Sequence, residues 1–134
     1  GLNAGSQYNT FPLMAGQLIP DGLFQRTPWY SNFTENLMTV QFDHRYMAKL
    51  SLIFVLTFWW FSRKLDLPKS CRLSLRCLLA AILLQFSLGV ATLLSIAWLP
   101  LASMHQGGAT ILLTAAVWTA HEFRHLRPAS DSTG

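Results

Sequence analysis

The chain has 134 residues, of which 51% are hydrophobic and only 12% are charged. A soluble domain carries about 25% charged residues, roughly twice this share, so the composition excludes an ordinary soluble protein and indicates an integral membrane protein. The formal net charge of +4 could suggest nucleic acid as a partner. The basic residues, however, cluster beside hydrophobic segments, as the positive-inside rule describes, so we expect membrane lipid and no nucleic acid.

Residues 1–40 contain too many glycines and prolines to sustain a helical period. We predict an outer-side loop with a short interfacial helix near Phe33–Met38, and Trp29 and Tyr30 suit a membrane–water interface. The chain begins at Gly1 without an initiator methionine, and we expect it to be a piece of a longer protein.

Residues 41–122 predict three transmembrane helices, at about 40–62, 76–97 and 102–121. From Cys77 to Ala120 there is no Asp, Glu, Lys or Arg, which suits two spans joined by a hairpin at Trp98-Leu99-Pro100. The predicted fold class is therefore an all-α transmembrane helical bundle, followed by an inner-side tail at 123–134. Basic residues are expected in one short loop on the inner side, between the first two spans: Arg63, Lys64, Lys69, Arg72 and Arg76.

His44 and His105 stand near the beginning of the first and third predicted spans. Because both spans run from outside to inside, the two imidazoles should lie at similar depth on parallel helices. Ionisable groups inside a membrane usually face a bundle interior, a cofactor or a cavity. Bis-histidine heme ligation suits this arrangement, with Arg45 or Lys49 pairing with the propionates. Two unrelated polar histidines at headgroup depth remain the competing interpretation.

The second and third spans each carry small and polar residues on one face. Gln85, Gly89 and Thr92 share a face of the second span, where helix packing is favoured over ligand binding. Gly107 and Gly108 follow His105 directly, and glycine is unfavourable inside a helix. We therefore expect another group to approach the third span closely at this point.

The run His121-Glu122-Phe123-Arg124-His125 fits the HExxH pattern of zinc peptidases. Catalytic zinc needs a third protein ligand, and only Asp131 follows. Snorkelling and favourable interaction with a helix C-terminus explain the same residues without zinc, so an intramembrane zinc peptidase is kept as a remote alternative.

Cys71 and Cys77 match neither a redox pair nor a zinc pattern and are expected to be free thiols.

Several motifs, in order and spacing, resemble the C-terminal half of heme A synthase. The resemblance extends up to about Glu122 and rests on the following segments: Gly1-Leu2-Asn3-Ala4-Gly5, Tyr8-Asn9-Thr10-Phe11-Pro12-Leu13-Met14, Glu35-Asn36, Val40-Gln41-Phe42-Asp43-His44-Arg45 and His105-Gln106. That family has eight transmembrane helices in two similar four-helix bundles. It oxidises a methyl group of heme O to the formyl group of heme A for cytochrome oxidase.

The resemblance implies a set of expectations for individual residues and partners. His44 and His105 match the two histidines that hold a b-type heme in the family's C-terminal bundle, and Arg45 is expected beside that cofactor. Glu35 matches an acidic motif associated with catalysis in the first bundle, which makes it a weak catalytic candidate here. The chain would form three spans of a four-helix half and would not turn over alone.

An electron donor protein and oxidase assembly factors are implied as partners, and a homo-oligomer is kept as a candidate assembly. The expected location is the mitochondrial inner membrane, with the bacterial plasma membrane as the alternative. A non-enzymatic b-type cytochrome that carries electrons is the principal alternative function.

Overall fold

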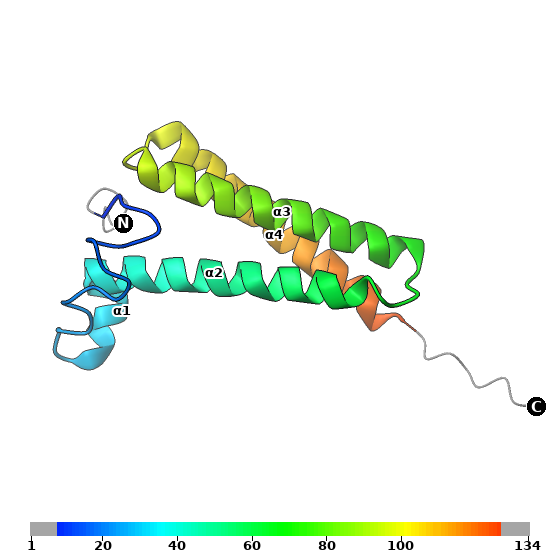
Figure 1. The fold of residues 1–134 in the computed structure, drawn as a ribbon, viewed down its shortest axis with the longest axis horizontal. Coiled ribbons are helices and arrows are strands. Elements are labelled where there is room, and N and C mark those ends of the chain that lie inside the picture. The colour runs from blue at the N-terminus through cyan, green and yellow to red at the C-terminus, as the bar shows by residue number, and fades with distance from the viewer. Residues whose placement is uncertain (1–7, 127–134) are drawn as a thin grey trace, which may run out of the picture.

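The computed structural model describes residues 8–126, and this part of the chain folds into helices without a β-strand (Figure 1). The all-α prediction is confirmed. Residues 1–7 and 127–134 lie outside the described part, and with them Asp131 and most of the predicted tail. The elements are a 3-10 helix η2 (Trp29–Ser31), α1 (Asn32–Glu35), α2 (Leu37–Ser62), α3 (Lys69–Leu94) and α4 (Leu99–Arg124).

The three long helices do not pack equally. α3 lies closely along α4, whereas no Cα atom of α2 comes within 8 Å of a Cα atom of α4. Figure 1 shows α2 and α3 close to each other near the connection that joins them and farther apart toward the opposite end. The N-terminal segment lies at that open end. The helices therefore leave a gap, which is widest on the predicted outer side.

The inner half of the molecule contains the apolar core. Val55 of α2, Ile82 of α3 and Ala115 of α4 belong to one buried cluster. A second cluster is formed around Cys71, which is free like Cys77, and includes Leu67 and Leu75. These contacts bring the helices together at one end only.

α3 has the composition of a membrane-spanning helix. Its most apolar window has a mean hydropathy of 2.3, and only 17% of that window is buried inside the protein. Exposed apolar side chains at this density suit a lipid environment. Among the described helices α3 alone meets this criterion of length and hydropathy. α2 and α4 carry more polar residues, including Arg45, Lys49, His105 and Gln106, and their membrane crossing stays a prediction.

The observed helix boundaries differ from the predicted ones at both ends of α3. α3 begins at Lys69, directly after Pro68, so Lys69, Arg72 and Arg76 lie on its first turns and not in the loop. The predicted boundary followed the start of the charge-free run at Cys77, whereas the helix extends about two turns further into the basic segment. α3 ends at Leu94, before Ile96 and Ala97, whose positive φ angles of 58° and 56° interrupt the helix.

Asn36 determines where α2 begins. Its side-chain oxygen accepts hydrogen bonds from the backbone N–H groups of Met38 and Thr39, at 3.1 and 3.3 Å. Its own extended backbone, with ψ of 104°, separates α1 from α2. The predicted interfacial helix at Phe33–Met38 is therefore divided between two helices, and α2 begins at Leu37, before the predicted position near Val40.

Asn32 holds the outer segment together. It is fully buried, and its oxygen accepts from the backbone N–H of Arg26 at 2.9 Å. Its amide nitrogen donates to the carbonyl oxygens of Arg26 and Trp29, at 2.9 and 2.8 Å. One side chain thus satisfies three backbone groups in a segment that has little helical structure of its own.

We predict that Asn32→Ala loosens this segment without unfolding the long helices. Leaving buried backbone groups unpaired costs about 2 kcal/mol, which corresponds to about thirty-fold faster amide hydrogen exchange at Arg26 through local opening. Hydrogen exchange measured by mass spectrometry checks this expectation.

Glu35→Gln is the control for this prediction, because it removes only the exposed ion pair between Glu35 and Arg26. Exchange at Arg26 that is equal in the two variants would contradict the role assigned to Asn32.

Candidate functional site

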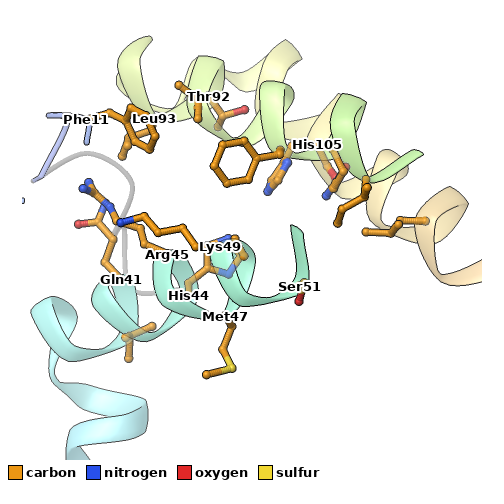
Figure 2. A pocket seen from close by; sticks show the side chains of 18 residues that line it. Phe11, Gln41, His44, Arg45, Met47, Lys49, Ser51, Thr92, Leu93 and His105 are labelled. Atoms are coloured by element: carbon orange, nitrogen blue, oxygen red, sulfur yellow. The ribbon is translucent and has the colours of Figure 1, made fainter. Parts of the chain in front are cut away.

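A cavity of about 530 Å³ occupies the gap between α2, α3 and α4 on the predicted outer side (Figure 2). All three long helices contribute to its wall, and Phe11 of the N-terminal segment contributes as well. Pockets that bind small molecules and cofactors have volumes of about 300–1,000 Å³ and mostly apolar walls. The position and size of this cavity make it the candidate site.

The two predicted ligand histidines face one another in this cavity. Figure 2 shows His44 pointing up from α2 and His105 pointing down from the opposite wall. Their ring centroids are 6.1 Å apart and their ring planes are nearly perpendicular, at 89°. The structure therefore brings together two side chains from helices whose backbones do not touch.

This separation matches that of two imidazoles bound to one metal ion. A metal–imidazole bond is about 2 Å long and the ring nitrogen lies about 1 Å from its centroid, so imidazoles on opposite sides of one metal ion have centroids about 6 Å apart. Perpendicular rings are compatible with this geometry, because each ring can rotate about its bond to the metal. The histidine pair thus fits the axial ligand set of a heme iron.

Unpartnered polar atoms also collect at the cavity. Buried side-chain atoms without a hydrogen-bond partner are found on five of its lining residues: Gln41 Oε1, Arg45 Nε, Gln85 Oε1, Thr92 Oγ1 and His105 Nδ1. Buried polar atoms in native proteins are nearly always hydrogen-bonded. Oε1 of Gln85 faces Gly108 of α4, so this atom lies within the wall of the cavity and does not point into its interior.

Arg45 forms hydrogen bonds with the N-terminal segment of the chain at the outer end of the cavity. Its Nη1 atom donates to the carbonyl oxygen of Thr10 at 2.9 Å and to that of Leu13 at 3.3 Å, and Nη2 donates to that of Tyr8. Gln41 adds a hydrogen bond to the Tyr8 carbonyl oxygen at 3.2 Å. We call residues 8–13 the strap, because these contacts hold them across the open end.

The strap also contributes an aromatic contact. Phe11 lines the cavity and packs edge-on against Phe86 of α3, with 6.3 Å between ring centroids. The strap therefore connects α2 to α3 where the helices themselves diverge. The residue pattern of 8–13 did not indicate that these residues bind Arg45, because Arg45 lies more than 30 positions away from Thr10 and Leu13 in the sequence.

Among the described residues that line the cavity, Lys49 is a second cation that can pair with an anionic ligand. The expected propionate partner Arg45 uses both terminal nitrogens on strap carbonyl groups. Lys49 also lines the cavity, and its ammonium lies 5.4 Å from the centroid of the Tyr46 ring. A cation–π contact of this kind leaves the ammonium able to pair with a carboxylate.

The other predicted site residues lie elsewhere. Glu35 ends α1, forms an exposed ion pair with Arg26 at 2.9 Å and does not line the cavity. At the far end of α4 the rings of His121 and His125 lie 4.5 Å apart, and Glu122 accepts a hydrogen bond from Trp118. Within residues 8–126 no group of three His, Cys, Asp or Glu side chains is arranged to hold a metal ion.

Comparison with known proteins identifies the family. A family model described as "Cytochrome oxidase assembly protein" (COX15-CtaA) matches residues 1–117. The chain belongs to this family. The sequence resemblance to heme A synthase is thereby confirmed at the level of the family.

Curated relatives agree with this assignment. The chain is 50% identical over 124 residues to the heme A synthase of Nitrosospira multiformis, 42% over 129 residues to heme A synthase COX15 of Arabidopsis thaliana, and 40% over 126 residues to that of Homo sapiens. These matches cover 92%, 96% and 94% of this chain and 35%, 28% and 31% of the relatives. The chain thus spans about a third of the length of these relatives. No solved structure matches it.

We predict that Arg45→Ala releases the strap. Charge-assisted hydrogen bonds to carbonyl groups contribute about 1.5–3 kcal/mol, so chymotrypsin should cleave after Tyr8 at least about tenfold faster in this variant. Cleavage products are quantified by mass spectrometry in detergent. Lys49→Ala is the matched control, because it removes a nearby cation that does not contact the strap. Equal cleavage in the two variants would show that Arg45 does not hold this segment.

Proposed function

We propose that this chain is the heme-binding C-terminal part of a heme A synthase, in which His44 and His105 are the axial ligands of a heme b. The observation that carries the proposal is the histidine pair, whose ring centroids lie 6.1 Å apart across a gap between two helices whose Cα atoms stay more than 8 Å apart. Membership of the family and the relatives named heme A synthase support the involvement of heme.

In this proposal each part of the cavity has a distinct task. The imidazoles of His44 and His105 hold the iron, and the ammonium of Lys49 pairs with a carboxylate side arm of the macrocycle. Phe11 and Phe86 exclude water from the outer edge. Arg45 acts indirectly, by holding the strap that carries Phe11. When bound, the heme supplies reversible one-electron transfer.

The activity of the intact protein is proposed from the family. We propose that it oxidises the methyl group of heme O to the formyl group of heme A, and that the chain of 134 residues supports this reaction without turning over alone. Heme O, an electron donor protein and oxidase assembly factors are the proposed partners.

The site is embedded in a membrane. The choice between a mitochondrial and a bacterial membrane stays a prediction, because the relatives include bacterial and eukaryotic proteins.

We predict that His44→Ala and His105→Ala, made separately in the intact protein, each abolish the low-spin b-type signal assigned to this site. Removing one axial imidazole leaves an open coordination position, so the bound heme becomes high-spin or is lost. The measurement is a reduced-minus-oxidised absorption spectrum of purified protein, with heme content determined by extraction.

His121→Ala is the matched control, since it removes a histidine from the other end of α4. Its spectrum and heme content should equal those of the unchanged protein. Identical spectra in the His44 and His105 variants and the unchanged protein would rule out the ligand assignment. Conversion of heme O to heme A by the intact protein separates a synthase from an electron carrier, which would show the same spectrum without this product.

A further inference from the structure

Three residues of the contact between α3 and α4 lie around His105. Gln85 of α3 is buried, and its amide nitrogen donates to the backbone carbonyl oxygen of His105 at 2.8 Å. Gly89, one turn further along α3, faces the imidazole itself. Gly108, one turn after His105 on α4, faces the side chain of Gln85. These contacts link the backbone and the ring of His105 to the same stretch of α3.

The two glycines leave no room for a side chain. A Cβ atom at Gly89 would lie 2.9 Å from Cε1 of His105 and 3.5 Å from both ring nitrogens. A Cβ atom at Gly108 would lie 2.3 Å from Oε1 of Gln85. In both cases the group that would be displaced is the end of a side chain, so an added methyl group would move the imidazole or the amide and leave the helices in place.

The neighbouring Gly107 provides an internal comparison. A Cβ atom there would meet nothing within 4 Å. Glycine is disfavoured in a helix interior whether or not space is restricted around it. Gly107 and Gly108 therefore look alike in the sequence, but only Gly108 is required by a contact with another helix.

We propose that Gln85, Gly89 and Gly108 are positioning residues that set the rotation of the His105 imidazole, and thereby its angle of 89° to the ring of His44. Gln85 fixes the backbone of His105 relative to α3, Gly108 makes room for that hydrogen bond, and Gly89 forms the surface against which the ring lies. The inference rests on the proposed function, because the ring angle matters only when both imidazoles bind one iron.

The experiment compares Gly89→Ala and Gly108→Ala with Gly107→Ala in the intact, heme-loaded protein. The electron paramagnetic resonance spectrum of a low-spin ferric heme depends on the angle between its two axial imidazole planes. We expect the heme to be retained in all three variants. The g-values and the midpoint potential should shift in the Gly89 and Gly108 variants and stay unchanged in the Gly107 variant.

A second measurement tests the proposed link between Gly108 and Gln85. Because the methyl group added by Gly108→Ala contacts only the Gln85 side chain closely, the spectrum of the double variant Gln85→Ala/Gly108→Ala should equal that of Gln85→Ala alone. If Gly89→Ala fails to accumulate, this comparison of the single and double variants still tests whether Gly108 acts through Gln85. Shifts that add independently, or spectra in which Gly89→Ala and Gly107→Ala are identical, would overturn the proposal.

Different results would refute the proposed function and the positioning role. Retention of the low-spin signal in His105→Ala would refute the proposed function itself. Loss of that signal in His105→Ala, together with unchanged spectra in Gly89→Ala and Gly108→Ala, would refute only the positioning role.

Discussion

The separation between α2 and α4 is the constraint on which the site depends. Apolar side chains such as Val55, Ile82 and Ala115 bring the three helices together at the inner end. No Cα atom of α2 comes within 8 Å of a Cα atom of α4 along the whole length of the helices. At the outer end the strap, which Arg45 holds, connects α2 to α3. A gap maintained at one end of a packed bundle can accommodate a flat ligand between two imidazoles, whereas direct packing of α2 on α4 would close it.

The cavity combines an apolar wall with polar atoms in a few places. His44 and His105 approach from opposite sides, and the cation Lys49 also lines the cavity. Buried polar atoms without partners, including Nδ1 of His105 and Oε1 of Gln85, are found on lining residues. An apolar wall excludes water and strengthens coordination and charge pairing inside the cavity. This combination distinguishes the cavity from the groove between α2 and α4 on the inner side, whose lining is almost entirely apolar.

Local sequence patterns predicted the helical fold and the histidine pair, because hydropathy and chain direction place His44 and His105 at one depth. The same reasoning did not reveal the contacts between distant segments. Arg45 has the charge of a propionate partner, yet its strap contacts depend on the tertiary placement of residues 8–13. Glu35 lies in a segment that resembles a family motif, but it forms an exposed ion pair with Arg26 and does not line the cavity. Likewise, the sequence cannot show that Gly108 faces another helix while Gly107 does not.

The most direct test of the account is a structure of the intact, heme-loaded protein determined by electron cryomicroscopy. We expect density for a macrocycle in the gap between α2 and α4, with the iron bonded to one ring nitrogen each of His44 and His105 at about 2 Å. It also predicts the strap across the outer edge and Lys49 beside a propionate. A gap filled by lipid or by a rearranged side chain, with heme bound elsewhere, would contradict it.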